Sequence, residues 1–173
     1  SNSYGQLGLG DTNYRSTPIL ISALDGIVVS DIIVNNNYST YFLTDDGKVY
    51  SCGYNGHGQL GLGDTTNRSI PTLITALNGI VVKDIINNNN SYSTYFLTND
   101  GKVYFINKNY LPVLNYRLNN LIIKDIVFDN FNIYFISNNF FVININKFIN
   151  IKINNFLFNK YFNNSNSTYF LTD

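Results

Sequence analysis

The feature that most constrains the fold of this chain is an internal repeat. Residues 5–11 read GQLGLGD, and residues 58–64 read GQLGLGD again, so Gln6 and Gln59 are 53 positions apart. The same spacing relates Asp11 to Asp64 and Arg15 to Arg68. It becomes 54 after an extra residue in the second copy, where Thr40 corresponds to Thr94. Such spacing predicts tandem copies of one structural unit.

Within a unit the local signals are those of antiparallel strands. In residues 39–50 the runs STYFLT and KVY are separated by Asp-Asp-Gly, and Asp-Gly supplies a tight hairpin turn. The apolar run 27–34 predicts a third strand, and residues 19–23 predict a fourth. STYFLT returns at 93–98 and 167–172, and a weaker NIYFIS occupies 132–137. No segment has the periodicity of an amphipathic helix. Four strands in about 50 residues, repeated in tandem, are typical of a β-propeller blade.

The motif resembles a known repeat family. GQLGLGD followed by Arg and Pro, an apolar strand, and a hairpin ending in Gly-Tyr-Asn at 53–55 is similar to the regulator-of-chromosome-condensation repeat. The repeat-signature residues, to which we assign a structural role, are Gly5, Gln6, Leu7, Gly8, Gly10, Asp11, Gly58, Gln59, Leu60, Gly61, Gly63 and Asp64. The resemblance implies an all-β propeller of antiparallel four-stranded blades, seven in the family. This chain has enough sequence for an incomplete arc of three to four blades, so we expect a portion of a longer propeller; a compact small propeller or an open sheet stack is the alternative.

The resemblance changes along the chain. Residues 1–104 are expected to form well-formed repeats, and residues 105–173 degenerate repeats of the same domain. Cys52 stands where the family commonly has Trp, and at the next copy Cys52 and Gly53 become Ile106 and Asn107. All 12 glycines precede residue 102. We therefore expect the third copy to have lost the loop geometry of the first two.

Composition argues against several function classes. The 11 basic and 11 acidic residues balance, although residues 1–101 carry 4 basic and 8 acidic groups and residues 102–173 carry 7 and 3. The chain has 31 Asn, one Cys, one His and no Glu, so no ordinary zinc site and no disulfide framework are expected. No apolar run is long enough for a membrane span. The start has no leader-like pattern, and an intracellular location, cytoplasmic or nuclear, is expected.

The candidate chemical motifs favour structure over catalysis. Gly56, Gly58 and Gly61 match G-x-G-x-x-G, but the helix that a dinucleotide site needs is not indicated after them. His57 is the sole candidate base, and no nucleophile pattern accompanies it. Asp and Arg at fixed spacing predict hydrogen bonds that brace the loops. We expect no catalytic residue, no cofactor and no metal.

These observations favour a non-catalytic protein–protein interaction module. Its loops would contact an unidentified protein partner, and His57, Arg15 and Arg68 are the candidate contacts. By resemblance alone, the alternative is a guanine-nucleotide exchange factor or chromatin-associated regulator of a small GTPase. Nucleic acid and small-molecule substrates are disfavoured, the former because the aromatic residues of the Lys-bearing tail fall in runs typical of buried strands.

Overall fold

The structure is a computed structural model of the whole chain. It describes residues 1–88, 93–128, 132–138, 141–144, 149–152, 158–163 and 168–172. The chain divides into two compact units, residues 1–99 with 103–115 and residues 100–102 with 116–173.

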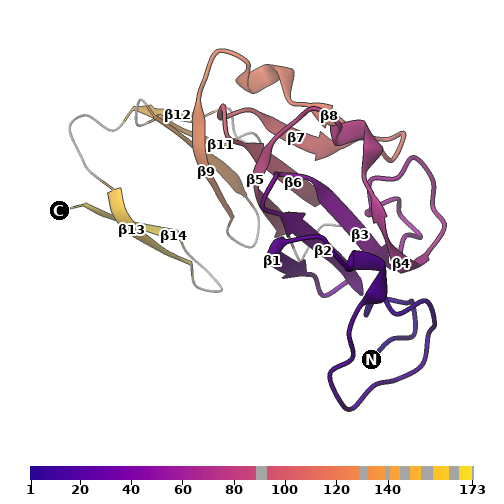
Figure 1. Cartoon of the computed structure of the whole chain (residues 1–173). Coiled ribbons are helices and arrows are strands. Elements are labelled where there is room, and N and C mark those ends of the chain that lie inside the picture. Colours follow the sequence, from indigo (N-terminus) through magenta and orange to yellow (C-terminus); the bar gives the residue numbers. More distant parts are fainter. Residues whose placement is uncertain are drawn as a thin grey trace. The chain divides into compact units, whose positions relative to one another are not determined.

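The first unit holds two antiparallel four-stranded sheets (Figure 1). Sheet A has the order β1-β2-β3-β4, and sheet B has the order β5-β6-β7-β8. The strands of sheet A are Val29–Val34, Ser39–Thr44, Val49–Gly53 and Arg68–Leu73. Those of sheet B are Val82–Asn88, Ser93–Thr98, Val103–Ile106 and Pro112–Leu114. The β-propeller-type architecture of four-stranded antiparallel blades is thus confirmed, and no closed sheet is present among the described residues.

The second unit repeats the pattern. Strands β9 to β12 form a third four-stranded sheet, and β13 pairs with β14 in a two-stranded one. Their bounds are Ile123–Phe128, Ile133–Ser137, Phe141–Asn144 and Ile149–Lys152, followed by Phe158–Asn163 and Thr168–Thr172. The described residues contain no α-helix, only the single 3₁₀ turns η1 (Ser22–Leu24), η2 (Thr75–Leu77) and η3 (Tyr116–Leu118).

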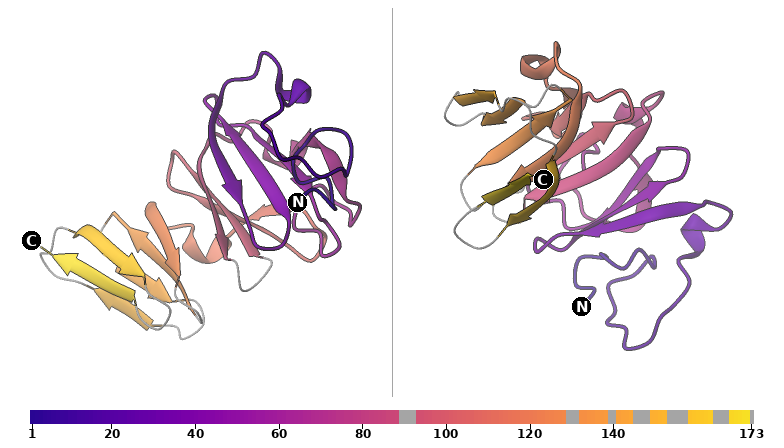
Figure 2. Two further views of the ribbon diagram at one scale, coloured as in Figure 1. Left: turned by 90° about the horizontal axis from the view of Figure 1, so that it is seen from below. Right: turned by 90° about the vertical axis from the view of Figure 1, so that its left-hand side faces the viewer.

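The prediction of a fourth strand at residues 19–23 was wrong. Residues 16–21 form no strand, and Ser22–Leu24 is η1. By the spacing of 53, residues 19–23 correspond to 72–76, where β4 ends and η2 begins, and β4 itself corresponds to residues 15–20. Strand β4 pairs with β3 of the first repeat through Tyr50↔Leu73 and Ser51↔Thr72. A strand needs a hydrogen-bonded neighbour, and the described residues offer none to the first copy. Figure 2 accordingly shows the indigo N-terminal segment as a loop.

Sheets A and B pack through one apolar core in the first unit. Sheet A contributes Tyr41, Leu43 and Val49, which alternate along their strands toward sheet B. The segment from Ile74, which precedes η2, to β6 contributes Ile74, Leu77, Val82, Ile85 and Phe96. Tyr41 and Phe96 meet edge to face, with ring centroids 6.4 Å apart. The core therefore joins one repeat to the next.

Candidate functional site

The glycine-rich loop of the second repeat is a pair of tight turns that only glycine accommodates readily. Gly58 N–H donates to the Asn55 carbonyl at 2.8 Å, and Gly61 N–H donates to the Gly58 carbonyl at 3.1 Å. Both glycines have positive φ, +70° and +73°. At Gly58 a Cβ would lie 2.0 Å from a ring atom of Tyr110. The glycines thus permit positive φ and close packing.

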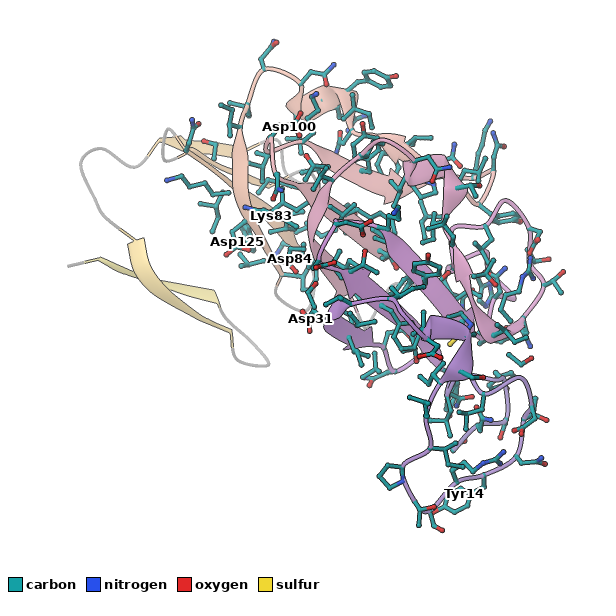
Figure 3. All side chains as sticks on the ribbon, in the orientation of Figure 1. Tyr14, Asp31, Lys83, Asp84, Asp100 and Asp125 are labelled. Atoms are coloured by element: carbon teal, nitrogen blue, oxygen red, sulfur yellow. The ribbon has the colours of Figure 1, made fainter. Side chains whose placement is uncertain are left out.

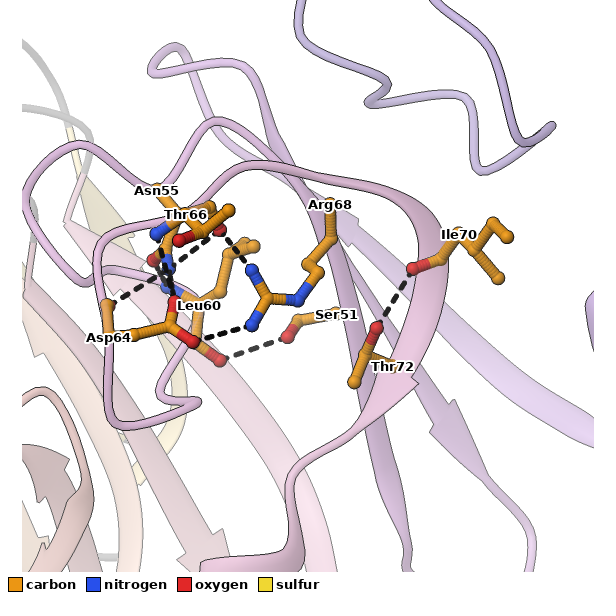
Figure 4. A network of polar contacts seen from close by, with 8 residues as sticks. All are labelled: Ser51, Asn55, Leu60, Asp64, Thr66, Arg68, Ile70 and Thr72. Atoms are coloured by element: carbon orange, nitrogen blue, oxygen red, sulfur yellow. Dashed lines mark hydrogen bonds and ion pairs between the residues drawn. The ribbon is translucent and has the colours of Figure 1, made fainter.

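Asn55 holds this loop together from inside. Its side-chain Nδ2 donates to the Asp64 carbonyl at 3.0 Å and the Thr66 carbonyl at 3.1 Å, and its Oδ1 accepts from Leu60 N–H at 2.9 Å (Figure 4). Asn55 is fully buried. One amide therefore joins the two ends of the loop.

An ion pair closes the outer side of the same loop. Arg68 Nη2 lies 2.6 Å from Asp64 Oδ2, and Arg68 Nη1 donates to the Thr66 carbonyl at 2.6 Å. The Arg68 hydrogen bond, with that from the Thr66 backbone, holds the pKa of Asp64 below its ordinary value. Because Arg68 is the first residue of β4, the pair ties the loop to sheet A.

The first repeat contains the same loop. Asn2 takes the place of Asn55: its Nδ2 donates to the Asp11 carbonyl at 2.9 Å, and its Oδ1 accepts from Leu7 N–H at 2.8 Å. Arg15 Nη2 lies 2.5 Å from Asp11 Oδ2. The backbone bond from Asn13 is the main cause lowering the pKa of Asp11, and Arg15 adds to it. Positive φ recurs at Gly5, Gly8 and Gly10.

The Gln-Leu pair of the motif faces the sheets. Gln59 is buried; its Oε1 accepts from His57 N–H at 3.0 Å, and its carbonyl accepts from the Tyr41 hydroxyl. The Leu60 side chain is buried, and its carbonyl accepts from Ser51 Oγ at 2.9 Å.

In the first repeat the Gln6 carbonyl accepts from Thr40 Oγ1 at 2.8 Å, while Gln6 Oε1 accepts from Tyr4 N–H at 3.0 Å. The repeated residues thus make intramolecular contacts in both copies, which favours the structural role that we assign to them.

The third copy departs from this pattern. Its connection between β7 and β8 contains only residues 107–111, where Asn107 Oδ1 accepts from the backbone N–H groups of Asn109 and Leu111 at 2.9 and 3.2 Å. Tyr110 there has a φ of +62°. The altered geometry expected from the lost glycines is present, yet Pro112–Leu114 still completes sheet B.

The residues singled out for chemistry do not form a reactive constellation. His57 is exposed, and its ring lies 6.0 Å from that of Tyr54. Cys52 is buried, and burial raises the pKa of its thiol to about 12. Within the described ranges, no group of three or more His, Cys or Asp side chains could hold a metal ion. Residues 64–67 after the G-x-G-x-x-G sequence are not helical.

One cavity lies beside the first loop. It has a volume of about 420 Å³ and is lined by Leu7, Leu9, Arg15, Ser16, Thr17, Pro18, Ile19 and Ile21. Its only charged group, Arg15, is already paired with Asp11. The part of the chain described here also has no helix long and apolar enough to cross a bilayer.

Four ring side chains gather where the first and second loops leave the sheet. The Tyr4 ring contacts those of Tyr38 and Tyr54 at centroid distances of 5.2 and 4.9 Å. The Tyr54 ring in turn contacts that of His57. We call Tyr4, Tyr38, Tyr54 and His57 the aromatic cluster. Tyr38 is 50% exposed and has a φ of +60°, so the cluster presents a ring to solvent from a constrained backbone.

Sequence reasoning missed two of these features. It named Asn55 only as the end of a hairpin and did not consider Asn2, because neither stands out among 31 Asn. Asn2 and Asn55 are 53 positions apart, as are the two glycine motifs, and this spacing could have identified them as part of the repeat. The aromatic cluster had no local signal, because Tyr38 comes from a different loop.

Comparison with known proteins agrees with the repeat geometry. The pattern of the "Regulator of chromosome condensation (RCC1) repeat" matches residues 46–86. The Ultraviolet-B receptor UVR8 of Arabidopsis thaliana is 40% identical over 78 residues, which are 45% of this chain and 18% of the receptor. The chain thus spans less than a fifth of that relative.

Two solved structures share the fold. Human WBSCR16 matches 83% of this chain and 40% of its own with a TM-score of 0.67 at 20% identity. Prp20p of Saccharomyces cerevisiae matches 67% of this chain and 32% of its own with a TM-score of 0.56 at 17% identity. Residues 46–86 thus match the regulator of chromosome condensation (RCC1) repeat, and the repeated loop and the four-stranded sheets make the chain similar to proteins built from that repeat.

Proposed function

We propose that this chain is a non-catalytic protein-binding module, with the aromatic cluster as the contact surface. The observation that carries the proposal is the contrast between two sets of residues. The polar groups of the loops are engaged with one another: Asp64 with Arg68, and Asn55 with both ends of its loop. The aromatic cluster, in contrast, presents a half-exposed ring at the loop surface.

Tyrosine suits such a surface because a large, rigid ring contributes contact area at a small entropic cost, and its hydroxyl forms hydrogen bonds. Tyr38 is held by its neighbours: Tyr54 N–H donates to the Tyr38 carbonyl at 2.9 Å, and the Tyr4 ring packs on the Tyr38 ring. A preorganised ring loses little freedom on binding. In this proposal Arg15 and Arg68 shape the loops, and of the three expected contact residues only His57 belongs to the surface.

A small GTPase or chromatin protein is the second candidate partner. Its support is the likeness to Prp20p, whose structure is described together with its binding properties to Gsp1p and histones. Because an identity of 17% supports a shared fold alone, the experiment below tests a small GTPase as a separate candidate partner.

The test is affinity capture with the 173-residue chain from an extract of the cells that produce it. The variant Tyr38→Asn removes the exposed ring while keeping a residue that tolerates positive φ. The control Tyr14→Ser removes a tyrosine that is 72% exposed on the N-terminal loop, away from β1–β4 (Figure 3). We expect a protein captured by wild type and Tyr14→Ser but at least tenfold less by Tyr38→Asn.

Equal capture by all three chains would overturn the role of the aromatic cluster. The absence of any specifically captured protein would overturn the proposed function itself. Adding a Ran-type GTPase loaded with labelled nucleotide separates the two candidates: accelerated nucleotide release would replace the non-catalytic proposal with the exchange-factor alternative.

A further inference from the structure

The turn between η2 and β5 has Asn and Gly at its centre and the backbone of a type II β-turn. Asn78 has φ −59° and ψ 132°, and Gly79 has φ +78°. The Ile80 N–H donates to the Leu77 carbonyl at 3.0 Å and closes the turn. In a turn of this type the N–H of the second central residue points away from the closing hydrogen bond. The backbone nitrogen of Gly79 is therefore left outside the hydrogen bonding of the turn.

Both central residues face solvent. Asn78 and Gly79 are exposed, and a Cβ at Gly79 would have no atom within 4 Å. In the part of the chain that the structure describes, neither the Asn78 side chain nor the Gly79 N–H has a hydrogen-bond partner. The residues that follow η1 and η3 in the other two copies, Asp25 and Asn119, are exposed as well. Exposure is thus a property of this turn in all three copies.

An Asn-Gly pair in such a turn can react without an enzyme, because the side-chain amide is an electrophile beside a backbone nucleophile. The Gly79 nitrogen loses its proton to water and attacks Asn78 Cγ. The new N–Cγ bond closes a succinimide ring, and Nδ2 takes up a proton and leaves as ammonia. Water then adds to one of the two ring carbonyls and gives aspartate or isoaspartate, with no oxidation or reduction. We propose that Asn78 is a site of spontaneous deamidation in the folded chain.

The fold leaves room for this ring closure. The peptide plane between Asn78 and Gly79 must rotate to bring the nitrogen onto Cγ, and this rotation breaks the hydrogen bond from Ile80 to Leu77. Because no atom occupies the space beside Gly79, opening this one turn suffices and the sheets stay intact. Glycine also carries no side chain that would hinder its own nitrogen.

The other Asn-Gly pair of the sequence, at residues 55–56, is protected. Asn55 is buried, its Nδ2 donates to the carbonyls of Asp64 and Thr66, and its Oδ1 accepts from Leu60 N–H. The leaving group and the electrophilic carbonyl are therefore both held by the loop. A Cβ at Gly56 would also lie 2.3 Å from the Tyr54 hydroxyl, so the Tyr54 ring obstructs rotation there. Asn55 is expected to react only when the loop unfolds.

The third copy has the same exposed turn without the glycine. There Leu121 N–H donates to the Leu118 carbonyl at 2.9 Å, but Asn119 is followed by Asn120. A side chain on the attacking residue hinders its nitrogen, so Asn119 should react slowly. Exposure and a following glycine are combined at Asn78 and at neither Asn55 nor Asn119.

The two products should affect the fold differently. Aspartate at position 78 repeats what the first copy already has, because Asp25 and Gly26 occupy the same turn and Asp25 has φ −60° and ψ 132°. Isoaspartate instead adds a carbon atom to the backbone between Leu77 and Ile80. Leu77 is 4% exposed in the core that joins sheets A and B, so the longer turn must displace a packed side chain.

Peptide mapping by mass spectrometry during storage of the 173-residue chain in neutral buffer tests the proposal. In the folded chain, Asn78 should convert at least tenfold faster than Asn55 and Asn119. In urea, with unfolding verified by circular dichroism, Asn55 and Asn78 should convert at similar rates because both precede glycine, and Asn119 should remain slower. A protein isoaspartyl methyltransferase, which methylates isoaspartyl residues, provides a second readout and should label the peptide that contains residue 78.

Equal conversion of Asn55 and Asn78 in the folded chain would overturn the proposal, as would conversion of Asn78 in urea alone. The variant Asn78→Asp carries one of the two products from the start. It should unfold at the same urea concentration as wild type and release no ammonia in the fast phase. Fast ammonia release from Asn78→Asp equal to that of wild type would assign the reaction to another residue and would also overturn the proposal.

Discussion

At the scale of single residues, the repeat is held by side chains whose role is to satisfy buried backbone groups. Asn2 and Asn55 do so in the two glycine loops, and both are buried. Asparagine suits the position because one amide supplies both a donor and an acceptor. Part of the large Asn content of the chain is therefore structural.

Replacing Asn55 should destabilise the first unit. Asn55→Ala removes the bonds to the Asp64 and Thr66 carbonyls and leaves Leu60 N–H without its acceptor. We expect a loss of about 3 kcal/mol in the free energy of unfolding, measured by urea denaturation. The control Asn109→Ala changes an exposed Asn and should cost less than about 0.5 kcal/mol. Equal losses in the two variants would contradict the bracing role of Asn55.

The hairpin turn between β2 and β3 should contribute a pH dependence. Hydrogen bonds from Lys48 and then Thr44 lower the pKa of Asp46 from 3.8 to about 2. A carboxyl whose pKa is depressed by folding stabilises the native state above pH 3.8, and this stabilisation is lost as the pH falls toward 2. Asp46→Asn and Lys48→Gln should each flatten the fall in unfolding free energy between pH 4 and 2. An unchanged slope in both variants would show that this ion pair has no linkage to folding.

At the scale of elements, the turns and hairpins were predictable because their signals are local. Two β-branched runs around Asp-Asp-Gly predicted the β2–β3 hairpin, and its pairing of Phe42 with Tyr50 is present. The strand expected at 19–23 was wrong because pairing is not local: residues 68–73, which correspond to 15–20, form β4 only against β3. The aromatic cluster could not be predicted for the same reason, because Tyr38 comes from a different loop.

Gly53 and Gly26 both have positive φ but differ in the space around their Cβ positions, so they can be compared directly. Gly53 has a φ of +103°, and a Cβ there would lie 2.2 Å from the Tyr38 carbonyl oxygen. Gly26 has a φ of +73° with nothing within 4 Å of its Cβ position. We expect Gly26→Ala to cost about 1–2 kcal/mol from the backbone alone, and Gly53→Ala about 3 kcal/mol or more because backbone atoms must move. Chemical denaturation of both variants measures the difference, and equal costs would contradict the close approach at Gly53.

At the scale of the molecule, each sheet of the first unit is assembled from two successive repeats. Strands β1 to β3 come from one copy and β4 from the next, and β5 to β8 follow the same rule. The core of Tyr41, Ile85 and Phe96 then packs the two sheets together. Stability in such an array is carried by the contacts between neighbours, so a segment without its neighbour is expected to be less protected.

Hydrogen exchange of two nearly identical segments tests this shared-sheet arrangement most directly. Residues 15–20 read RSTPIL and residues 68–73 read RSIPTL, so their intrinsic exchange rates are similar, but only the second segment is a strand. The measurement uses mass spectrometry on the 173-residue chain. We predict that amides in 68–73 exchange at least a hundredfold more slowly than those in 15–20. Equal exchange in the two segments, or faster exchange in 68–73, would contradict the sharing of each sheet between successive repeats.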